Sequence, residues 1–135
     1  MDVAKCKALK HELASQEEPQ VVSIERFFDG NDDEGSIGCN LMKHPGVDTF
    51  RRAFVDLKHR AGVQSIYAQI TELDPGEDSW PFTDTVIVIG SITPEELQKA
   101  LAGLEPDEVS PGTPDFLSPA LSDADKARAL VAWWD

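Results

Sequence analysis

The feature that most constrains the fold is the run Thr-Val-Ile-Val-Ile at residues 85–89. β-Branched residues favour strands, and a short run that is apolar on both faces is typical of a buried strand. The run therefore predicts the central strand of a sheet. Residues 63–73 instead alternate, with Ile66, Ala68 and Ile70 on one face and polar side chains on the other. This alternation predicts a half-buried antiparallel strand.

Two segments have the apolar spacing of helices that pack on a core. Apolar side chains recur there every three or four residues: Val47, Phe50, Phe54 and Leu57 in the first, and Leu97, Ala100, Leu101 and Leu104 in the second. Gly62 is expected to end the first helix. Thr93, Pro94 and Glu96 supply an N-cap, a proline at the first helical position and a capping box, so the second helix begins at Pro94.

The order of the predicted elements indicates the fold class. Ile37, Cys39 and Leu41 alternate within residues 36–41, which predicts a first strand, and residues 127–134 suit a last strand. The order is then strand, helix, strand, strand, helix, strand, which predicts an α+β fold, a ferredoxin-like βαββαβ two-layer sandwich with an antiparallel sheet. Both helices would cover one face. The other face would be covered by a short helix at 24–28, by the proline-rich link that follows Leu104, or by a second subunit.

The chain is expected to contain one domain. Residues 1–20 have only a thin apolar stripe, which predicts a flexible, helical N-terminal extension to a single α+β domain at 21–135. The first segment is too polar for a signal peptide, and no apolar run is long enough to span a membrane. A cytoplasmic location is therefore expected, with Cys6 and Cys39 as free thiols and Cys39 in the core.

The charge balance limits the partners. The 25 Asp and Glu residues outnumber the 12 Lys and Arg residues, and the net charge is −13. Such a charge repels phosphate backbones and anionic membranes, so neither nucleic acid nor a membrane is an expected partner. It favours basic proteins.

The loop at residues 29–35, here called the acidic loop, is the main candidate for a functional site. Its Asp29, Asn31 and Asp33 alternate as at the start of a calcium-binding EF-hand loop. The match ends there, because Glu34 replaces the required glycine and Asn40 replaces the required final glutamate. The pattern therefore favours carboxylates that cap helices and strands. A Ca²⁺ or Mg²⁺ site and a loop that contacts a partner or ligand remain as alternatives.

The candidate binding residues follow from this loop and from two side chains expected near it. They are Asp29, Asn31, Asp32, Asp33, Glu34, His44 and Trp80. Trp80 lies in an aromatic turn at 80–82, which either caps the open end of the core or forms a recognition patch; the first is favoured. No zinc spacing, phosphate-binding loop or nucleophile motif occurs, so no metal, cofactor or catalytic residue is predicted.

Four segments resemble a known group of proteins. They are residues 30–41, residues 80–86 beginning Trp-Pro-Phe, residues 105–109 and the closing Trp-Trp-Asp. Together they make residues 21–135 similar to a family of small acidic uncharacterised bacterial proteins, a domain of unknown function. The resemblance implies a bacterial cytoplasmic setting and assigns no catalytic residue.

These observations favour a non-catalytic protein-binding or regulatory module, with an inhibitor- or immunity-like masking of a basic partner as its specific form. The partner would be another protein or a second copy of the chain. The alternative hypothesis is a small ligand- or metal-binding domain, or a small enzyme, with a pocket near the acidic loop.

Overall fold

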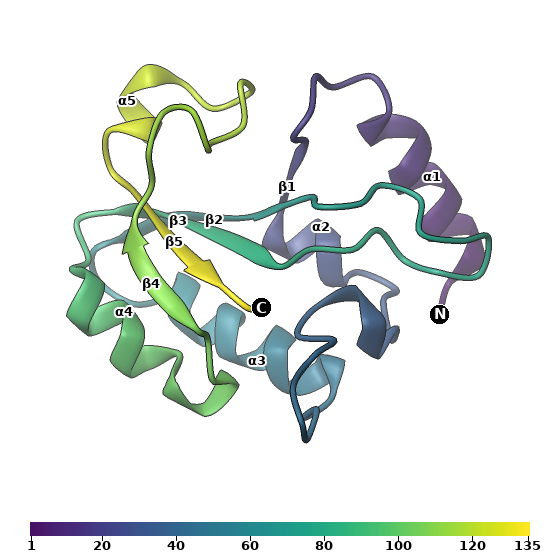
Figure 1. Cartoon of the computed structure of the whole chain (residues 1–135), viewed down its shortest axis with the longest axis horizontal. Helices are drawn as coiled ribbons and strands as arrows, with labels where there is room; N and C mark the ends of the chain where they lie inside the picture. The colour runs from purple at the N-terminus through teal and green to yellow at the C-terminus, as the bar shows by residue number, and fades with distance from the viewer.

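The expected central strand is present in the computed structural model, which describes all 135 residues (Figure 1). Strand β3 (Thr85–Gly90) pairs with β2 (Val63–Gln69) on one side and with β5 (Ala129–Trp133) on the other. Two short strands form the edges, β1 (Val21–Ser23) beside β2 and β4 (Glu108–Pro111) beside β5. The result is a five-stranded antiparallel sheet in the order β1-β2-β3-β5-β4.

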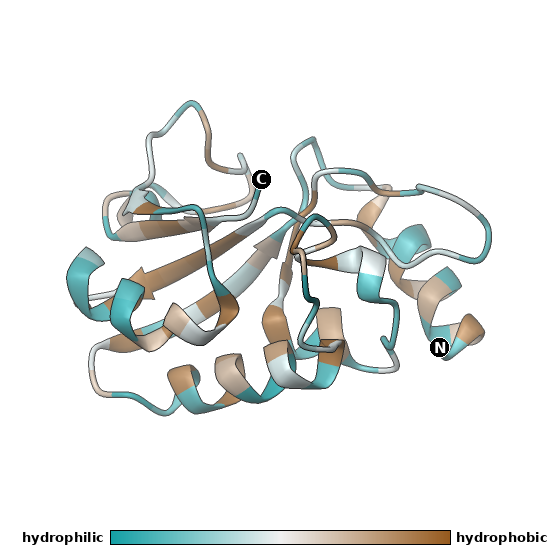
Figure 2. Cartoon of the chain, turned by 60° about the horizontal axis from the view of Figure 1, so that its bottom comes forward, coloured by the Kyte–Doolittle hydropathy of each residue, from teal (hydrophilic) through white to brown (hydrophobic).

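Helices α3 (Val47–Lys58) and α4 (Pro94–Ala100) cover one face of this sheet, whereas α5 (Asp123–Lys126) lies on the other side with the link. The helical segments are α1 (Val3–Leu13), α2 (Ile24–Phe28), the 3-10 turn η1 (Glu34–Ser36), α3 (Val47–Lys58), α4 (Pro94–Ala100), the 3-10 turn η2 (Ala102–Leu104) and α5 (Asp123–Lys126). Figure 1 shows α3 and α4 side by side under the sheet. The main core lies between these layers and includes Phe50, Phe54 and Leu97, each fully buried. In Figure 2 the central strands are the most hydrophobic, while the sides of the helices that face away from the sheet are mainly hydrophilic.

The capping residues predicted for α4 act as expected. The Thr93 side chain accepts a hydrogen bond from the Glu96 backbone, and the Glu96 carboxylate accepts one from the Thr93 N–H. The backbone hydrogen bond from Thr93 lowers the pKa of Glu96 below its usual value. A cap of this kind stabilises a helix by about 1 kcal/mol. Ala100, which was expected to be buried, is exposed because α4 ends there.

The proline-rich link covers much of the second face of the sheet. Leu117 and Leu121 from the link pack on Ile87, Ile89 and Val131, which point away from the helices. One buried side chain holds the link in place. Gln69 donates a hydrogen bond to the Phe116 carbonyl at 3.0 Å and accepts one from the Ser118 N–H at 2.9 Å. The link is thus one of the expected coverings of this face, whereas the side chains of α2 belong to the main core.

The predicted first strand at residues 36–41 is absent, and this prediction was wrong. Asp33 caps the turn η1, which ends at Ser36, and only Ile37 then forms a single β-bridge, to Thr83. Gly38 has a φ of +64°, and a Cβ there would lie 2.7 Å from the Phe50 ring. A residue in the left-handed region interrupts a strand, so the chain turns instead of extending. Cys39 is therefore exposed and not in the core.

The α+β class and the antiparallel sheet are confirmed, but the sheet does not have the expected βαββαβ order. Its first strand is β1, three residues long, which runs directly into α2. Its fourth strand, β4, lies within the proline-rich link, where no strand was predicted. Both are short edge strands without a clear alternation of apolar and polar residues. Their formation therefore depends on pairing with β2 and β5.

The N-terminal segment forms a helix that packs on the domain. Cys6, Leu9 and Leu13 of α1 are each no more than 2% exposed and belong to the main core. Burying a leucine side chain contributes about 1.5–3 kcal/mol, so these contacts tie α1 to the rest of the chain. Residues 1–20, expected as an appendage, therefore share the core of residues 21–135. No helix of the chain has both the length and the apolar character to cross a bilayer.

Candidate functional site

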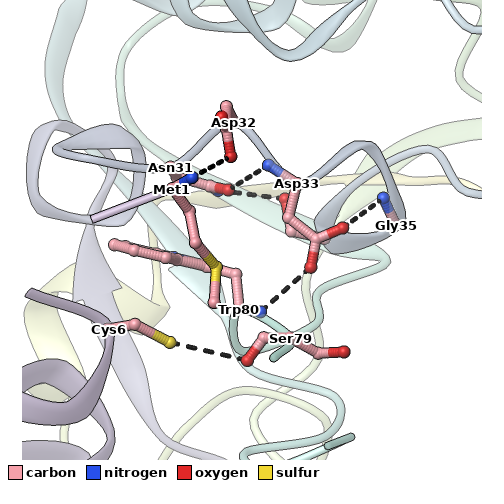
Figure 3. A network of polar contacts seen from close by, with 9 residues as sticks. Met1, Cys6, Asn31, Asp32, Asp33, Gly35, Ser79 and Trp80 are labelled. Atoms are coloured by element: carbon pink, nitrogen blue, oxygen red, sulfur yellow. Dashed lines mark hydrogen bonds and ion pairs between the residues drawn. The ribbon is translucent and has the colours of Figure 1, made fainter. Parts of the chain in front are cut away.

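The acidic loop is built from hydrogen bonds between its own residues (Figure 3). The Asn31 amide donates to the Ser36 hydroxyl at 2.9 Å and to the Phe27 carbonyl, and its oxygen accepts from the Asp33 N–H. Asp33 in turn accepts from the Gly35 N–H at 2.9 Å. Ser36 is fully buried. Asn31 and Asp33, two of the three residues that resemble an EF-hand start, thus shape the loop.

The carboxylates of this loop connect it to distant parts of the chain. The second oxygen of Asp33 accepts a hydrogen bond from the Trp80 N–H at 3.0 Å, across 47 residues. Asp29 forms an ion pair with Lys5 of α1 at 2.7 Å. Asp32 pairs with the α-amino group of Met1 at 2.8 Å, and this hydrogen bond raises the pKa of the amine and lowers the pKa of Asp32. These three carboxylates join α1, the loop and the turn at Trp80.

His44 and Trp80 lie beside the loop but are engaged in the fold. The Gly46 N–H donates to His44 Nδ1 at 2.9 Å, so Nε2 carries the proton and donates to the Ile37 carbonyl at 2.8 Å. Glu34 is exposed and lies 3.9 Å from His44 Nδ1. Trp80 is only 1% exposed, and its indole nitrogen has no hydrogen-bond partner. Trp80 therefore closes the core, as the favoured hypothesis predicted.

The structure brings the seven candidate residues together, and most of their polar atoms already have partners. No group of three or more His, Cys, Asp and Glu side chains has a geometry that could hold a metal ion. A small cavity of about 290 Å³ lies beside the loop, lined in part by Asp33, Cys39 and Glu72. The exposed Cys39 thiol is its most reactive group. Cys6 is buried, and burial raises the pKa of its thiol.

A larger open groove of about 820 Å³ lies between α2 and α3. Phe28, Phe54 and Val55 form its apolar part, and Arg26 and Arg51 line its charged rim. Both arginines are paired within the chain, to a glutamate of α1 and to an aspartate of α3 respectively. A partner that used these charges would have to replace existing ion pairs.

A third hollow, which the sequence did not indicate, lies on the second face of the sheet. This β4–β5 hollow has a volume of about 340 Å³ and is lined by Glu108, Ser110, Pro111, Phe116, Val131 and Trp133. Phe116 is 45% exposed. Trp133 is half-buried, unlike the next residue, Trp134, which faces the main core. Successive side chains of a strand point to opposite faces, so the pair of tryptophans at the end of β5 is the sequence signal that could have placed Trp133 on this face.

The negative charge is concentrated in residues 61–125. Residues 61–125 contain thirteen of the 25 Asp and Glu residues but only one of the 12 basic residues, Lys99. Residues 1–60 contain nine basic residues, which nearly balance their carboxylates. Of the elements that border the second face of the sheet, β4 and the link lie within these residues and contain no basic side chain.

The fold and these sites define a small acidic α+β protein with an open hollow on its sheet and a structural acidic loop. The chain belongs to the Uncharacterized protein YfbO family, whose sequence model matches residues 4–132. It is 27% identical over 117 residues to "Uncharacterized protein YfbO" of Escherichia coli (strain K12), and the aligned part covers 85% of this chain and 82% of that protein. No solved structure matches this chain. The expected relation to an uncharacterised bacterial family is thus confirmed.

Proposed function

We propose that the chain is a non-catalytic binding module of the bacterial cytoplasm that recognises and masks a basic partner protein. The observation that carries this proposal is the excess of carboxylates in residues 61–125, where Lys99 is the one basic residue. A one-sided negative field attracts basic proteins and accelerates their association, while it repels nucleic acid and anionic lipid.

The shape of the second face supports the same proposal. An interface needs an apolar centre with a polar rim, and aromatic residues are enriched at such centres. The β4–β5 hollow has this composition, with Phe116 and Trp133 inside and Glu108 at its edge. A second copy of the chain fits this face less well, because two copies with a net charge of −13 repel each other.

Capture of partners from a bacterial lysate tests the proposal. The tagged chain is compared with two double variants that remove the same charge at exposed sites. The link variant combines Asp115→Asn in the link with Asp123→Asn at the start of α5, and the N-terminal variant combines Glu17→Gln with Glu18→Gln. We expect a basic protein to be retained at low and moderate salt by the wild type and the N-terminal variant, and less by the link variant. Equal retention by both variants, or no basic partner at low salt, would contradict the proposal. Mass measurement in solution separates a foreign partner from self-association.

The alternative function is a ligand-binding domain or small enzyme that uses the cavity beside the acidic loop. The exposed Cys39 thiol next to Asp33 and Glu72 favours it. A thermal-shift screen of metals and metabolites tests this alternative, because a bound ligand stabilises the folded state in proportion to RT ln(1 + [L]/Kd). A concentration-dependent shift that is lost in Cys39→Ser would support it. A flat screen would count against it.

A further inference from the structure

The walls of the β4–β5 hollow are fixed by the fold. Glu108 and Trp133 are directly paired residues of neighbouring strands, as are Ser110 and Val131, so all four side chains stand on the second face of the sheet. The opposite wall is Phe116, whose carbonyl accepts the hydrogen bond from buried Gln69. Two aromatic rings therefore border the hollow. The backbone of one wall is held by the pairing of β4 with β5, and that of the other by Gln69.

The carboxylates around Trp133 are not neutralised. Glu108 pairs with Trp133 in the sheet, the Asp107 N–H donates to the Trp133 carbonyl at 2.8 Å, and the Asp84 backbone carbonyl accepts from the Trp134 N–H at 2.9 Å. None of these three carboxylates is part of an ion pair in the chain. No Lys, Arg or His occurs in residues 100–125, which supply β4 and the link. This end of the sheet is thus an uncompensated negative patch beside an aromatic hollow.

Exposed aromatic faces next to carboxylates suit one kind of side chain. An arginine guanidinium stacks on aromatic rings and forms hydrogen-bonded pairs with carboxylates. The volume of about 340 Å³ lies at the small end of the range of ligand pockets, about 300–1,000 Å³, which fits one long side chain better than a helix. A symmetric contact with a second copy would place Glu108 near its own equivalent, so the charge disfavours that occupant.

We propose that the β4–β5 hollow binds an arginine side chain of an extended basic segment of the partner, stacked between Trp133 and Phe116 and paired with Glu108. The inference rests on the proposed function, since it names the surface that would contact a basic partner. The carboxylates of Asp84 and Asp107 would attract the rest of that segment without holding a defined position.

A peptide titration followed by amide and indole NMR signals tests the inference. The probe is the blocked pentapeptide Gly-Gly-Arg-Gly-Gly, and its citrulline counterpart is the neutral match. We expect saturable shifts at the Trp133 indole and at the amides of Ser110 and Val131. The citrulline peptide should bind roughly fivefold more weakly or worse, because cation–π and ion-pair contributions are lost.

Matched variants identify the contact. Glu108→Gln should raise the Kd of the arginine peptide about threefold, the size expected for an exposed ion pair. Glu105→Gln removes the same charge just before β4 and should leave the Kd unchanged. Both side chains are exposed, so neither change should alter the fold, and the amide spectrum verifies this.

Three results would overturn the inference: shifts centred on the groove between α2 and α3, equal binding of the citrulline peptide, or no shift at low salt. None of them removes the proposed function, which lysate capture tests separately. Conversely, specific shifts in the hollow together with no basic partner in the lysate would support the arginine site and count against the proposed masking role.

Discussion

The substitution Asp33→Ala should destabilise the fold far more than a change at an exposed loop carboxylate normally does. Asp33 is the N-cap of η1 through its bond to the Gly35 N–H at 2.9 Å, and it also accepts from the Trp80 N–H at 3.0 Å. Loss of a cap costs about 1 kcal/mol, and loss of a hydrogen bond to a charged group costs about 1.5–3 kcal/mol. Because both bonds belong to one side chain, the expected loss is about 2–4 kcal/mol.

Urea unfolding at neutral pH measures this loss, and Asp32→Ala is the matched control one residue away. The Asp32 side chain is 77% exposed and pairs only with the amino group of Met1. Its removal should change the free energy of unfolding much less. Asp33→Asn keeps one acceptor oxygen and should fall between the wild type and Asp33→Ala. If Asp33→Ala unfolds within about 0.5 kcal/mol of the wild type, the loop does not hold the turn at Trp80, and the structural explanation of its carboxylates is refuted.

Three further predictions concern other parts of the fold. Gln69→Leu should lower the free energy of unfolding in urea by about 2–4 kcal/mol, because the Phe116 carbonyl and the Ser118 N–H of the link lose their hydrogen-bond partners. An unchanged midpoint of unfolding would show that water replaces both bonds. Gly38→Ala should lower the free energy of unfolding by about 1–3 kcal/mol, because the new Cβ would lie 2.7 Å from the Phe50 ring at a residue with a φ of +64°. An unchanged free energy of unfolding would show that this turn accepts a side chain. Thiol labelling at pH 8 should modify Cys39 rapidly and Cys6 only after unfolding, because burial raises the pKa of the Cys6 thiol; equally fast labelling of both would contradict the packing of α1.

The elements that could be predicted are those whose sequence pattern is local. The run at 85–89, the spacing of Phe50 and Phe54 and the capping box at Thr93 all specify their structure within a few residues. The short helix α2 also spans the expected residues 24–28, with Ser23 as its N-cap. In each case propensity, periodicity and capping agree, and the structure follows them.

The elements that could not be predicted depend on partners distant in sequence. The alternation of Ile37, Cys39 and Leu41 resembles a strand, but Gly38 turns against Phe50, a contact that only the folded chain reveals. In the same way, β4 forms because β5 is available to pair with it, although its own sequence ends in Pro111.

The candidate site illustrates the same limit. The composition of the acidic loop could be seen in the sequence, and capping was the favoured explanation of its carboxylates. The bond from Asp33 to Trp80 spans 47 residues and could not be predicted. The hollow was missed because Phe116 and Trp133 come from separate segments that meet only on the second face of the sheet.

The acidic loop and the β4–β5 hollow have different roles. Figure 1 shows the chain between α2 and α3 at the lower right and the link with α5 at the upper left. Asp29, Asp32 and Asp33 of the loop bind other parts of the fold, whereas Asp84, Asp107 and Glu108 beside the hollow form no ion pair within the chain. A basic partner should therefore contact the second face of the sheet.

Hydrogen–deuterium exchange of the chain, alone and saturated with the basic partner captured from the lysate, shows which surface the partner covers. We expect slower exchange in peptides that cover residues 107–116 and 130–135, and unchanged exchange in those that cover residues 29–35. Protection confined to residues 29–35, with none on β4, β5 or the link, would contradict this expectation.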